Sequence, residues 1–240
     1  DQLEAIANEN DLAAVKMEVQ RSEPPCKNFL ENIRNLCDKK GIPLIFDECT
    51  SGFRETFGGL HLKYGVFPDM AIFGKALGNG YAITATIGKA SLMQAAQNTF
   101  ISSTFWTERI GPSAALKTLE IMQREKSWEK VTDIGFDLKK KWQEIADNNN
   151  VKIVQYGLPA LAGFNILSDE KLAYKTYITQ ELLKNGFLAA TNCYTSLAHT
   201  PDLINQYIDQ LNNIFAELSK IYNDEGQTIK SKLEGPICHS

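Results

Sequence analysis

The stretch Pro43-Leu-Ile-Phe-Asp-Glu-Cys-Thr-Ser-Gly-Phe-Arg54 decides the fold of this 240-residue chain. Its apolar residues 44–46 have a proline before them and small residues soon after them, which is typical of a short strand buried on both faces of a parallel sheet. Two carboxylates, Asp47 and Glu48, follow directly. Because ligands of open α/β sheets bind beyond the carboxyl ends of the strands, this strand end is a candidate site.

A second stretch, Met70-Ala-Ile-Phe-Gly-Lys-Ala-Leu-Gly-Asn-Gly80, repeats this order of an apolar run followed by a turn. The turn is rich in glycine and holds Lys75, a residue type that prefers solvent. A lysine amine attacks an aldehyde only in its neutral form, which partial burial or a nearby cation favours. Alone, the pattern would fit a surface lysine. Together with Asp47, it makes Lys75 the first candidate for a catalytic residue.

The rest of the chain alternates between helical and strand spacing of apolar residues. Helices are expected at residues 1–10, 29–40, 91–97, 107–122, 129–148, 170–185 and 201–223. Strands are expected at residues 12–19, 44–46, 70–73, 81–87, 151–156, 162–166 and 187–190, and a loose tail at 226–240. This order predicts an α/β fold with a mainly parallel sheet, followed by a smaller α+β layer. We expect two domains, residues 1–126 and 127–240.

The composition gives no reason to expect a nucleic-acid-binding, membrane-spanning or metal-binding protein. Hydrophobic residues make up 43% of the chain, and the net charge of −4 gives no reason to expect nucleic acid or an anionic membrane as a partner. No apolar run approaches the roughly 20 residues that span a bilayer. The five cysteines are odd in number and lack metal-ligand spacing. They indicate free thiols in a reducing, cytoplasmic environment and no metal site, although each could equally be a small packing residue.

Three motifs together resemble one enzyme family. They are Asp-Glu-x-x-x-Gly-Phe-Arg at 47–54, Pro-Asp-x-x-x-x-Gly-Lys-x-x-Gly-x-Gly at 68–80 and Ser-Thr-Phe at 103–105. The set is similar to the class III pyridoxal-phosphate aminotransferases, and within them to the glutamate-1-semialdehyde 2,1-aminomutase-like branch. The resemblance runs from about Ala13 to about Tyr222. It implies part of a fold type I large domain followed by a C-terminal small domain, and it implies that the N-terminal part of the large domain precedes Asp1.

The resemblance also implies residue roles. Lys75 would carry pyridoxal 5′-phosphate as an internal aldimine and then move a proton between two carbons of the substrate. Asp47 would hold the ring nitrogen of the cofactor in its protonated form, although a helix cap or a salt-bridged strand end would also explain an aspartate there. Cys49 stands where the family usually has valine against the cofactor ring, which would place a reactive thiol near it. Glu48 is expected to be structural.

Ser103 and Thr104 are the expected phosphate-binding residues, because phosphate groups favour hydroxyl donors and helix N-termini. In the family, the threonine of this motif reaches the cofactor phosphate of the other subunit, so the resemblance implies a homodimer with Thr104 acting across the interface. The family's Gly-Asn-Pro after this motif is altered here, which makes Thr107 a second candidate. Each of these hydroxyls could instead simply cap the helix.

Three other positions match the family less fully. Gly78, Asn79 and Gly80 stand where it has a glycine triplet. Glu18 matches a glutamate of the family's Glu-Pro pair, with a different residue after it. His199 lies in a segment that in the family approaches the substrate pocket, although packing at a helix start is the simpler interpretation.

Three functions remain in view. The first is a pyridoxal-phosphate-dependent aminotransferase that moves an amino group from an amino donor to a carbonyl acceptor. The second is an aminomutase that does so within one amino aldehyde. The third is a non-catalytic part that needs its missing N-terminal half. A nucleotide-binding domain is disfavoured, because neither a Walker spacing nor a Gly-x-Gly-x-x-Gly follows the first strand. The sequence does not name the substrate.

Overall fold

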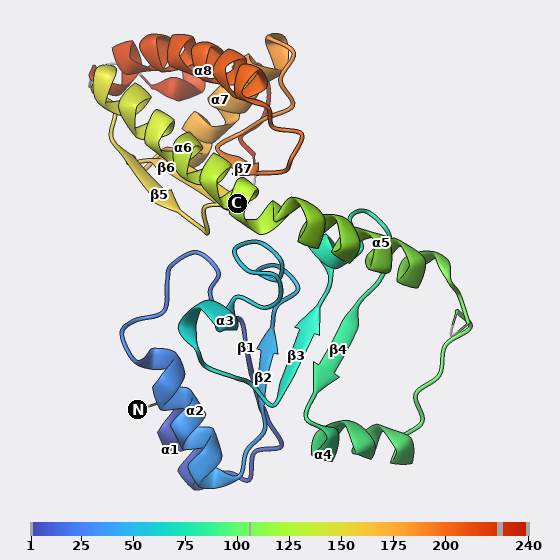
Figure 1. Ribbon diagram of the computed structural model, residues 1–240. Helices are drawn as coiled ribbons and strands as arrows, with labels where there is room; N and C mark the ends of the chain where they lie inside the picture. Colours follow the sequence, from blue (N-terminus) through green and yellow to red (C-terminus); the bar gives the residue numbers. More distant parts are fainter. Residues whose placement is uncertain (1, 106, 225–227, 239–240) are drawn as a thin grey trace. The chain divides into compact units, whose positions relative to one another are not determined.

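The computed structural model describes residues 2–105, 107–224 and 228–238. The chain divides into two compact units, residues 1–129 and 130–240 (Figure 1). We call them unit 1 and unit 2.

Unit 1 contains a four-stranded sheet in the order β1-β2-β3-β4. Its strands are β1 (Val15–Met17), β2 (Leu44–Asp47), β3 (Met70–Phe73) and β4 (Ala85–Gly88). The first three strands are parallel, and β4 runs antiparallel to β3 (Figure 1). The predicted mainly parallel sheet is therefore confirmed, and the carboxyl ends of β2 and β3 lie at the same edge.

Unit 1 also contains several helices. They are α1 (Gln2–Glu9), α2 (Phe29–Lys40), α3 (His61–Tyr64), α4 (Ala90–Met93) and α5 (Ile110–Glu125), with 3₁₀ turns η1 (Lys75–Leu77) and η2 (Gln94–Asn98). Helix α2 has the predicted limits because Gly41 ends it in the left-handed conformation, at φ 68°, and donates its N–H to the last turn. Helix α5 begins at Ile110, three residues later than predicted, because the described residues 99–105 and 107–109 form no helix.

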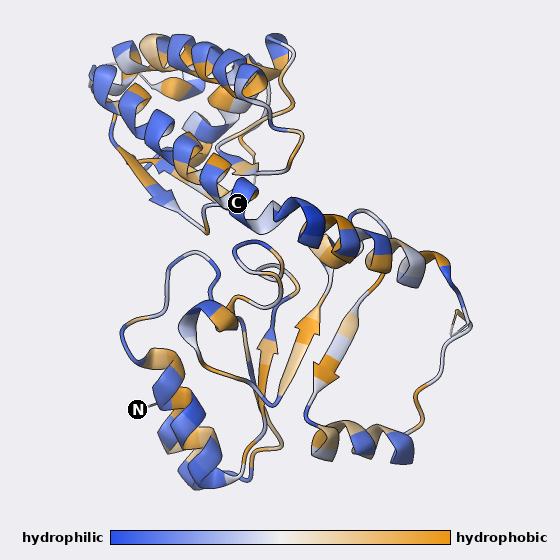
Figure 2. Ribbon diagram, in the orientation of Figure 1, coloured by the Kyte–Doolittle hydropathy of each residue, from blue (hydrophilic) through white to orange (hydrophobic). Residues whose placement is uncertain are grey.

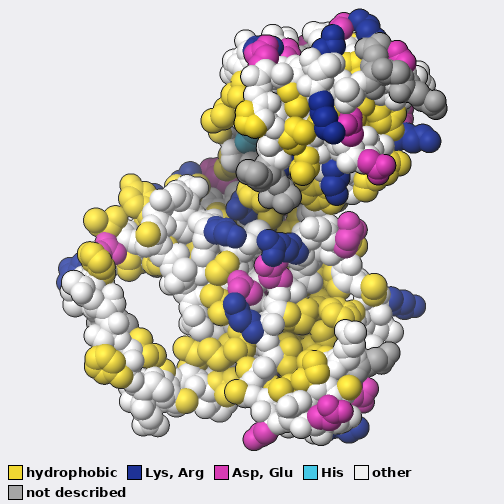
Figure 3. All heavy atoms as spheres, turned by 180° about the vertical axis from the view of Figure 1, so that it is seen from behind, with side chains coloured by type: hydrophobic (Ala, Val, Ile, Leu, Met, Phe, Trp, Pro, Cys, Tyr) yellow, Lys and Arg dark blue, Asp and Glu magenta, His cyan; other side chains and the backbone are white. Residues whose placement is uncertain are grey.

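The two faces of the unit 1 sheet differ in burial. Leu44, Phe46, Ala71 and Phe73 are buried, and the register pairs Phe46 with Ala71, so these residues share one face. On the other face, the residues of β2 and β3, Asp47 among them, are half-buried. Figure 2 shows the hydrophobic character of these strands, and Figure 3 shows hydrophobic side chains gathered beside several charged ones on one face of this unit.

Unit 2 is an α+β layer, as expected. Its antiparallel sheet consists of β5 (Ile153–Tyr156), β6 (Leu161–Ile166) and β7 (Asn192–Tyr194). The helices are α6 (Ser127–Asn148), whose first residues belong to unit 1, α7 (Lys171–Lys184) and α8 (Pro201–Tyr222). Trp142, Phe164 and Phe215 are fully buried at the centre of one large core, and Phe164 contacts both other rings.

The predicted strand at residues 187–190 is wrong. These residues take no strand conformation, and Leu188 is 95% exposed. The third strand is instead β7, where Asn192 and Cys193 pair with Gly163 and Ala162 of β6. Whether a segment joins this sheet therefore depends on the backbone hydrogen-bond partners that it finds, and not on its apolar character alone. Strand β1 is also shorter than predicted, and β4 begins later.

The predicted loose tail is wrong for the part that the structure describes. Residues 228–238 pack on unit 2, where η3 (Ile229–Lys232) contacts α7 and α8 and the Ile229 side chain is fully buried. Lys230 pairs with Glu170 at 2.8 Å, and Lys184 with Glu234 at 2.6 Å. The other tail residues, 226, 227, 239 and 240, lie outside the described residues.

Two expectations about the whole chain can be checked. All five cysteines are free, which confirms the predicted thiols. Within the described ranges, no helix combines the length and the apolar character needed to cross a membrane.

Candidate active site

The carboxyl ends of β2 and β3 bring the two main candidates to one edge of the unit 1 sheet. Asp47 is the last residue of β2 and pairs in register with Ile72 of β3. Lys75 follows the end of β3 after a single glycine. A carboxylate and an amine therefore stand on neighbouring strand ends, where ligands bind in open α/β sheets.

Lys75 is held in a constrained turn. Its φ of 45° lies in the left-handed region, which a side chain with a β-carbon rarely adopts. Such local strain persists only where the surrounding structure imposes it, and it is frequent at functional sites. The amine nitrogen Nζ donates a hydrogen bond to Oγ1 of Thr50 at 2.5 Å. Thr50 belongs to the loop after β2, so this bond ties the two strand ends together.

Asp47 makes an ion pair across the sheet. Its Oδ2 lies 2.8 Å from Nζ of Lys16 in β1, and its Oδ1 accepts the backbone N–H of Cys49 at 3.2 Å. The hydrogen bond from Lys16 is the largest cause that holds the pKa of Asp47 below its usual value; burial opposes it, and the bonds from Cys49 add to it. Asp47 is therefore an anion at neutral pH.

Cys49 is half-buried beside the same edge. A β-carbon added at Gly74 would lie 3.3 Å from the Cys49 sulfur, so the glycine before Lys75 gives this side chain room. Burial raises the pKa of the Cys49 thiol, and the Asp47 charge raises it further, although Lys75 and Lys16 oppose this. A raised pKa leaves little thiolate at neutral pH.

Glu48 is fully buried, in line with the expected structural role. It accepts hydrogen bonds from the Ser51 hydroxyl at 2.5 Å, from the backbone N–H groups of Leu60 and His61, and from the His61 ring at 2.8 Å. Burial alone would raise the pKa of Glu48, but these hydrogen bonds outweigh it and hold the pKa below its usual value. The carboxylate thereby fixes the loop that carries Thr50.

Ser103 and Thr104 do not lie at this edge in the described chain. Both are exposed in the segment between η2 and α5, which Figure 1 shows running apart from the strands β1 to β3. The Ser103 hydroxyl accepts a local hydrogen bond from the N–H of Phe105 at 3.2 Å. Because α5 begins at Ile110, neither residue caps that helix, and neither does Thr107.

The glycine-rich turn after Lys75 depends on its small residues. A β-carbon at Gly78 would collide with the carbonyl oxygen of Tyr81, while Asn79 and Gly80 have positive φ values of 46° and 102°. The turn therefore tolerates no larger residue at Gly78. This constraint fixes the path of the chain directly after Lys75.

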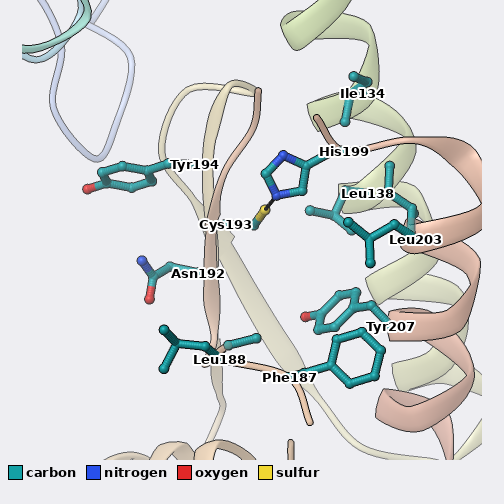
Figure 4. Close-up of a pocket in the computed structure, with 12 residues that line it drawn as sticks. Ile134, Leu138, Phe187, Leu188, Asn192, Cys193, Tyr194, His199, Leu203 and Tyr207 are labelled. Carbon is teal, nitrogen blue, oxygen red and sulfur yellow. Dashed lines mark hydrogen bonds between the residues drawn. The ribbon is translucent and has the colours of Figure 1, made fainter. Parts of the chain in front are cut away.

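His199 lies in unit 2, where it borders a cavity of about 350 Å³ (Figure 4). Its Nε2 is 3.6 Å from the Cys193 sulfur, and its Nδ1 accepts the backbone N–H of Ser196 at 3.0 Å. Nδ1 as an acceptor leaves the proton on Nε2 in the neutral ring, which points it at the sulfur. These contacts are local to the loop before α8, in agreement with a packing role.

Three residues of this region escaped the sequence analysis. Lys16, Thr50 and His61 contact Asp47, Lys75 and Glu48, respectively. Thr50 lies three residues after Asp47 within the first motif, so its position was visible although its partner was not. Lys16 and Glu18 are the two charged residues of an otherwise apolar predicted strand, a pattern that could have drawn attention to them.

Comparison with known proteins gives these features a context. The model of the family "Aminotransferase class-III" matches residues 1–221. A 3-aminobutyryl-CoA aminotransferase from Cloacimonas acidaminovorans is 33% identical over 92% of this chain, and a glutamate-1-semialdehyde 2,1-aminomutase from Ignicoccus hospitalis is 28% identical over 90%. The chain spans 57% and 56% of the length of these two relatives, respectively.

A solved structure shows the same fold. The FumI protein of Sphingopyxis sp. MTA144, solved in its PLP internal aldimine form, superposes with a TM-score of 0.85 at 22% identity, over 93% of this chain and 56% of that one. The likeness extends through both units of the chain, which confirms the predicted α/β fold of the type I transferases. By the family model that it matches, the chain belongs to the class III aminotransferases.

Proposed function

We propose that this protein is a pyridoxal-phosphate-dependent aminotransferase in which Lys75 and Asp47 are the catalytic residues. The observation that carries the proposal is the placement of these two side chains on adjacent parallel strand ends. Membership of the class III family supports it. Residues 1–126 would form part of the cofactor-binding domain, and residues 127–240 the small domain.

The described residues fit the cofactor. Asp47 is an anion on the half-buried face of the sheet, which suits a ring nitrogen that must stay protonated. Lys75 is exposed, and among the described residues its amine is held by the neutral Thr50 hydroxyl, which suits an amine that must reach an aldehyde carbon. Gly74 leaves the Cys49 side chain its room at this edge, because a β-carbon there would lie 3.3 Å from the sulfur.

Each residue has a distinct task. When bound, pyridoxal phosphate supplies an electron sink for the charge left on carbon when a substrate proton departs. Asp47 would keep the proton on the ring nitrogen, because its lowered pKa makes it an anion at neutral pH. Lys75 would hold the cofactor through its amine, and the same amine could take up and return a proton of the substrate. Thr50 orients the Lys75 amine.

The amino acceptor is a carbonyl compound, and transfer between two molecules is favoured over transfer within one. The basis is that the relative named as an aminotransferase is 33% identical, against 28% for the one named as an aminomutase. The aminomutase remains the second candidate, since the cofactor chemistry is shared. Incubation with an amino donor and no acceptor separates them, because only an aminotransferase releases the keto product of the donor and keeps its nitrogen.

The active form would be a cytoplasmic homodimer with Thr104 and Ser103 reaching the cofactor phosphate of the partner. In support, their segment projects apolar side chains into solvent: Phe100 is 97% exposed and Phe105 76%. Exposed apolar side chains grouped in one segment are typical of an interface. The free cysteines agree with a reducing compartment. Sedimentation of wild type and Thr104→Ala would test the assembly, with cofactor affinity reduced in the variant and the dimer retained.

The alternative of a non-catalytic part makes an opposite prediction for the same protein. An enzyme converts donor to keto product in proportion to bound cofactor, and Lys75→Ala abolishes this turnover. If the purified protein binds the cofactor without turnover of any donor, the aminotransferase proposal fails.

A further inference from the structure

Lys16 is a charged side chain at the centre of β1, and it faces Asp47. The register pairs Lys16 with Ile45, and Asp47 lies two residues further along β2, so the two side chains stand on the same face of the sheet. Nζ of Lys16 lies 2.8 Å from Oδ2 of Asp47. Lys16 is 56% exposed on its side chain, so it is free to change partners.

This contact uses the carboxylate that the proposed function assigns to the cofactor. Oδ2 of Asp47 holds Lys16, and Oδ1 accepts the N–H of Cys49, so both oxygens already have protein partners. A protonated ring nitrogen would therefore share this carboxylate with the ammonium group or replace it. Because two cations on one carboxylate repel each other, replacement is favoured where the displaced ammonium group has a second acceptor.

Glu18 offers the displaced ammonium group a second partner. Its Oε2 is buried and has no hydrogen-bond partner among the described residues, while its Oε1 lies 3.8 Å from Arg21. Glu18 stands two residues after Lys16, and its charge acts on the Lys16 ammonium. A buried carboxylate oxygen without a donor is unfavourable, so a lysine that reached it would satisfy it.

We propose that Lys16 is a positioning residue that pairs with Asp47 before the cofactor binds and moves to Glu18 when the ring nitrogen takes its place. The inference rests on the proposed function, since it concerns the same carboxylate. Lys16 then competes with the cofactor for Asp47, and Glu18 reduces this competition. The residue thereby sets the affinity of the site for the cofactor ring.

The first test needs no cofactor. The titratable and charged groups that face Asp47 are Lys16 from β1 and Cys49 from its own loop, and Lys75 after β3 acts on Cys49. The Asp47 carboxyl carbon is titrated by ¹³C NMR in wild type, Lys16→Met and Lys16→Arg. The midpoint is expected to rise in Lys16→Met and to stay near wild type in Lys16→Arg. An equal midpoint in all three proteins would overturn the inference.

The second test measures the dissociation constant of pyridoxal phosphate by absorbance titration of the whole protein. Lys16→Met should bind it about two- to fivefold more tightly than wild type, given the strength of exposed ion pairs. Lys16→Arg should bind like wild type, and Glu18→Gln more weakly, because Lys16 then loses its second partner. Lys39→Met, an exposed lysine on α2, is the control and should bind unchanged.

The outcomes separate the two proposals. If Lys16→Met binds the cofactor as wild type does, or more weakly, the role of Lys16 is overturned while the proposed function stands. If neither wild type nor any variant binds the cofactor, the proposed function is overturned, and the role of Lys16 toward the cofactor falls with it. The NMR titration then still decides whether the ion pair with Asp47 exists.

Discussion

At the residue scale, Asp69 shows how strongly a single carboxylate is held in unit 1. It contacts Arg34 at 2.8 Å, Lys89 at 2.6 Å and the backbone N–H of Leu44 at 2.8 Å. Burial alone would raise its pKa, but these contacts outweigh it and lower the pKa from 3.8 to about 2. Asp69 thereby joins the start of β2, helix α2 and the end of β4.

A pH dependence follows from this lowered pKa. The stability that Asp69 contributes is fully present above about pH 4 and is lost as the pH falls through about 2. The shift corresponds to roughly 2 kcal/mol at neutral pH. We expect Asp69→Asn to lower the free energy of unfolding at pH 7 by about that amount and to flatten its acid dependence. Urea unfolding at several pH values checks this, and an unchanged acid limb would contradict it.

Glu48 gives a second residue-scale prediction. Glu48→Ala removes the acceptor of Ser51, of the His61 ring and of two backbone N–H groups, all of them buried. Unpaired buried donors of this kind cost about 3–5 kcal/mol in total. We expect unit 1 to unfold at a clearly lower urea concentration. Glu31→Ala, at an exposed position of α2, should stay within about 0.5 kcal/mol of wild type.

The contacts of Glu48 and Lys16 also show which features of single residues could not be predicted from the sequence. The positions of Asp47 and Lys75 at neighbouring strand ends could be predicted, because a motif places each of them just after a buried apolar run. Their partners Lys16 and Thr50 could not, because the pairing of a side chain across strands depends on register and on the loop that Glu48 fixes. Neither register nor loop conformation is written in local spacing.

At the element scale, helix propensity and packing make opposite predictions for the stability of a variant at Gly135 in helix α6. Helix propensity predicts that Gly135→Ala stabilises α6 by about 1 kcal/mol. A β-carbon at this position would, however, collide with the carbonyl oxygen of Pro159. Overpacking of this kind costs about 1–3 kcal/mol, so we expect Gly135→Ala to lower the melting temperature. Asp133→Ala, exposed on the same helix, is the control. A higher melting temperature for Gly135→Ala than for wild type would contradict the close contact between Gly135 and the Pro159 carbonyl.

The docked tail gives the second prediction for an element. Ile229 is fully buried in the unit 2 core, whereas Ile237 is 36% exposed. We expect Ile229→Ala to cost about 2–4 kcal/mol and Ile237→Ala less than 1 kcal/mol. Thermal unfolding of both variants compares them directly. Equal small effects would mean that the tail contributes nothing to the core.

Elements were predictable where local pattern and tertiary contacts agree. Helix α2 and strand β3 have the predicted limits because Gly41 ends one and the buried apolar run defines the other. The failures have a common cause. Residues 187–190 are apolar but find no strand partner, and residues 228–238 look polar but are tied down by Ile229 and two ion pairs.

At the scale of the whole molecule, the two units differ in how far their apolar residues are buried. Unit 2 encloses a single large core around Trp142 and Phe164. The sheet of unit 1 leaves Ile45, Asp47, Met70 and Ile72 only half-buried on one face. We expect a chain of residues 127–240 to fold alone, with cooperative thermal unfolding and a dispersed amide NMR spectrum. A broad, non-cooperative transition would contradict this.

The most direct test of the central claim, that Lys75 carries the cofactor beside Asp47, is an absorbance spectrum of the whole protein with pyridoxal phosphate. Wild type should show a band at about 410–430 nm, typical of the cofactor linked to a lysine amine, and the band should bleach on borohydride reduction. Lys75→Ala should show no such band. Lys63→Ala, another lysine of unit 1, should keep it. A band that persists in Lys75→Ala, or no band in wild type, would contradict the account.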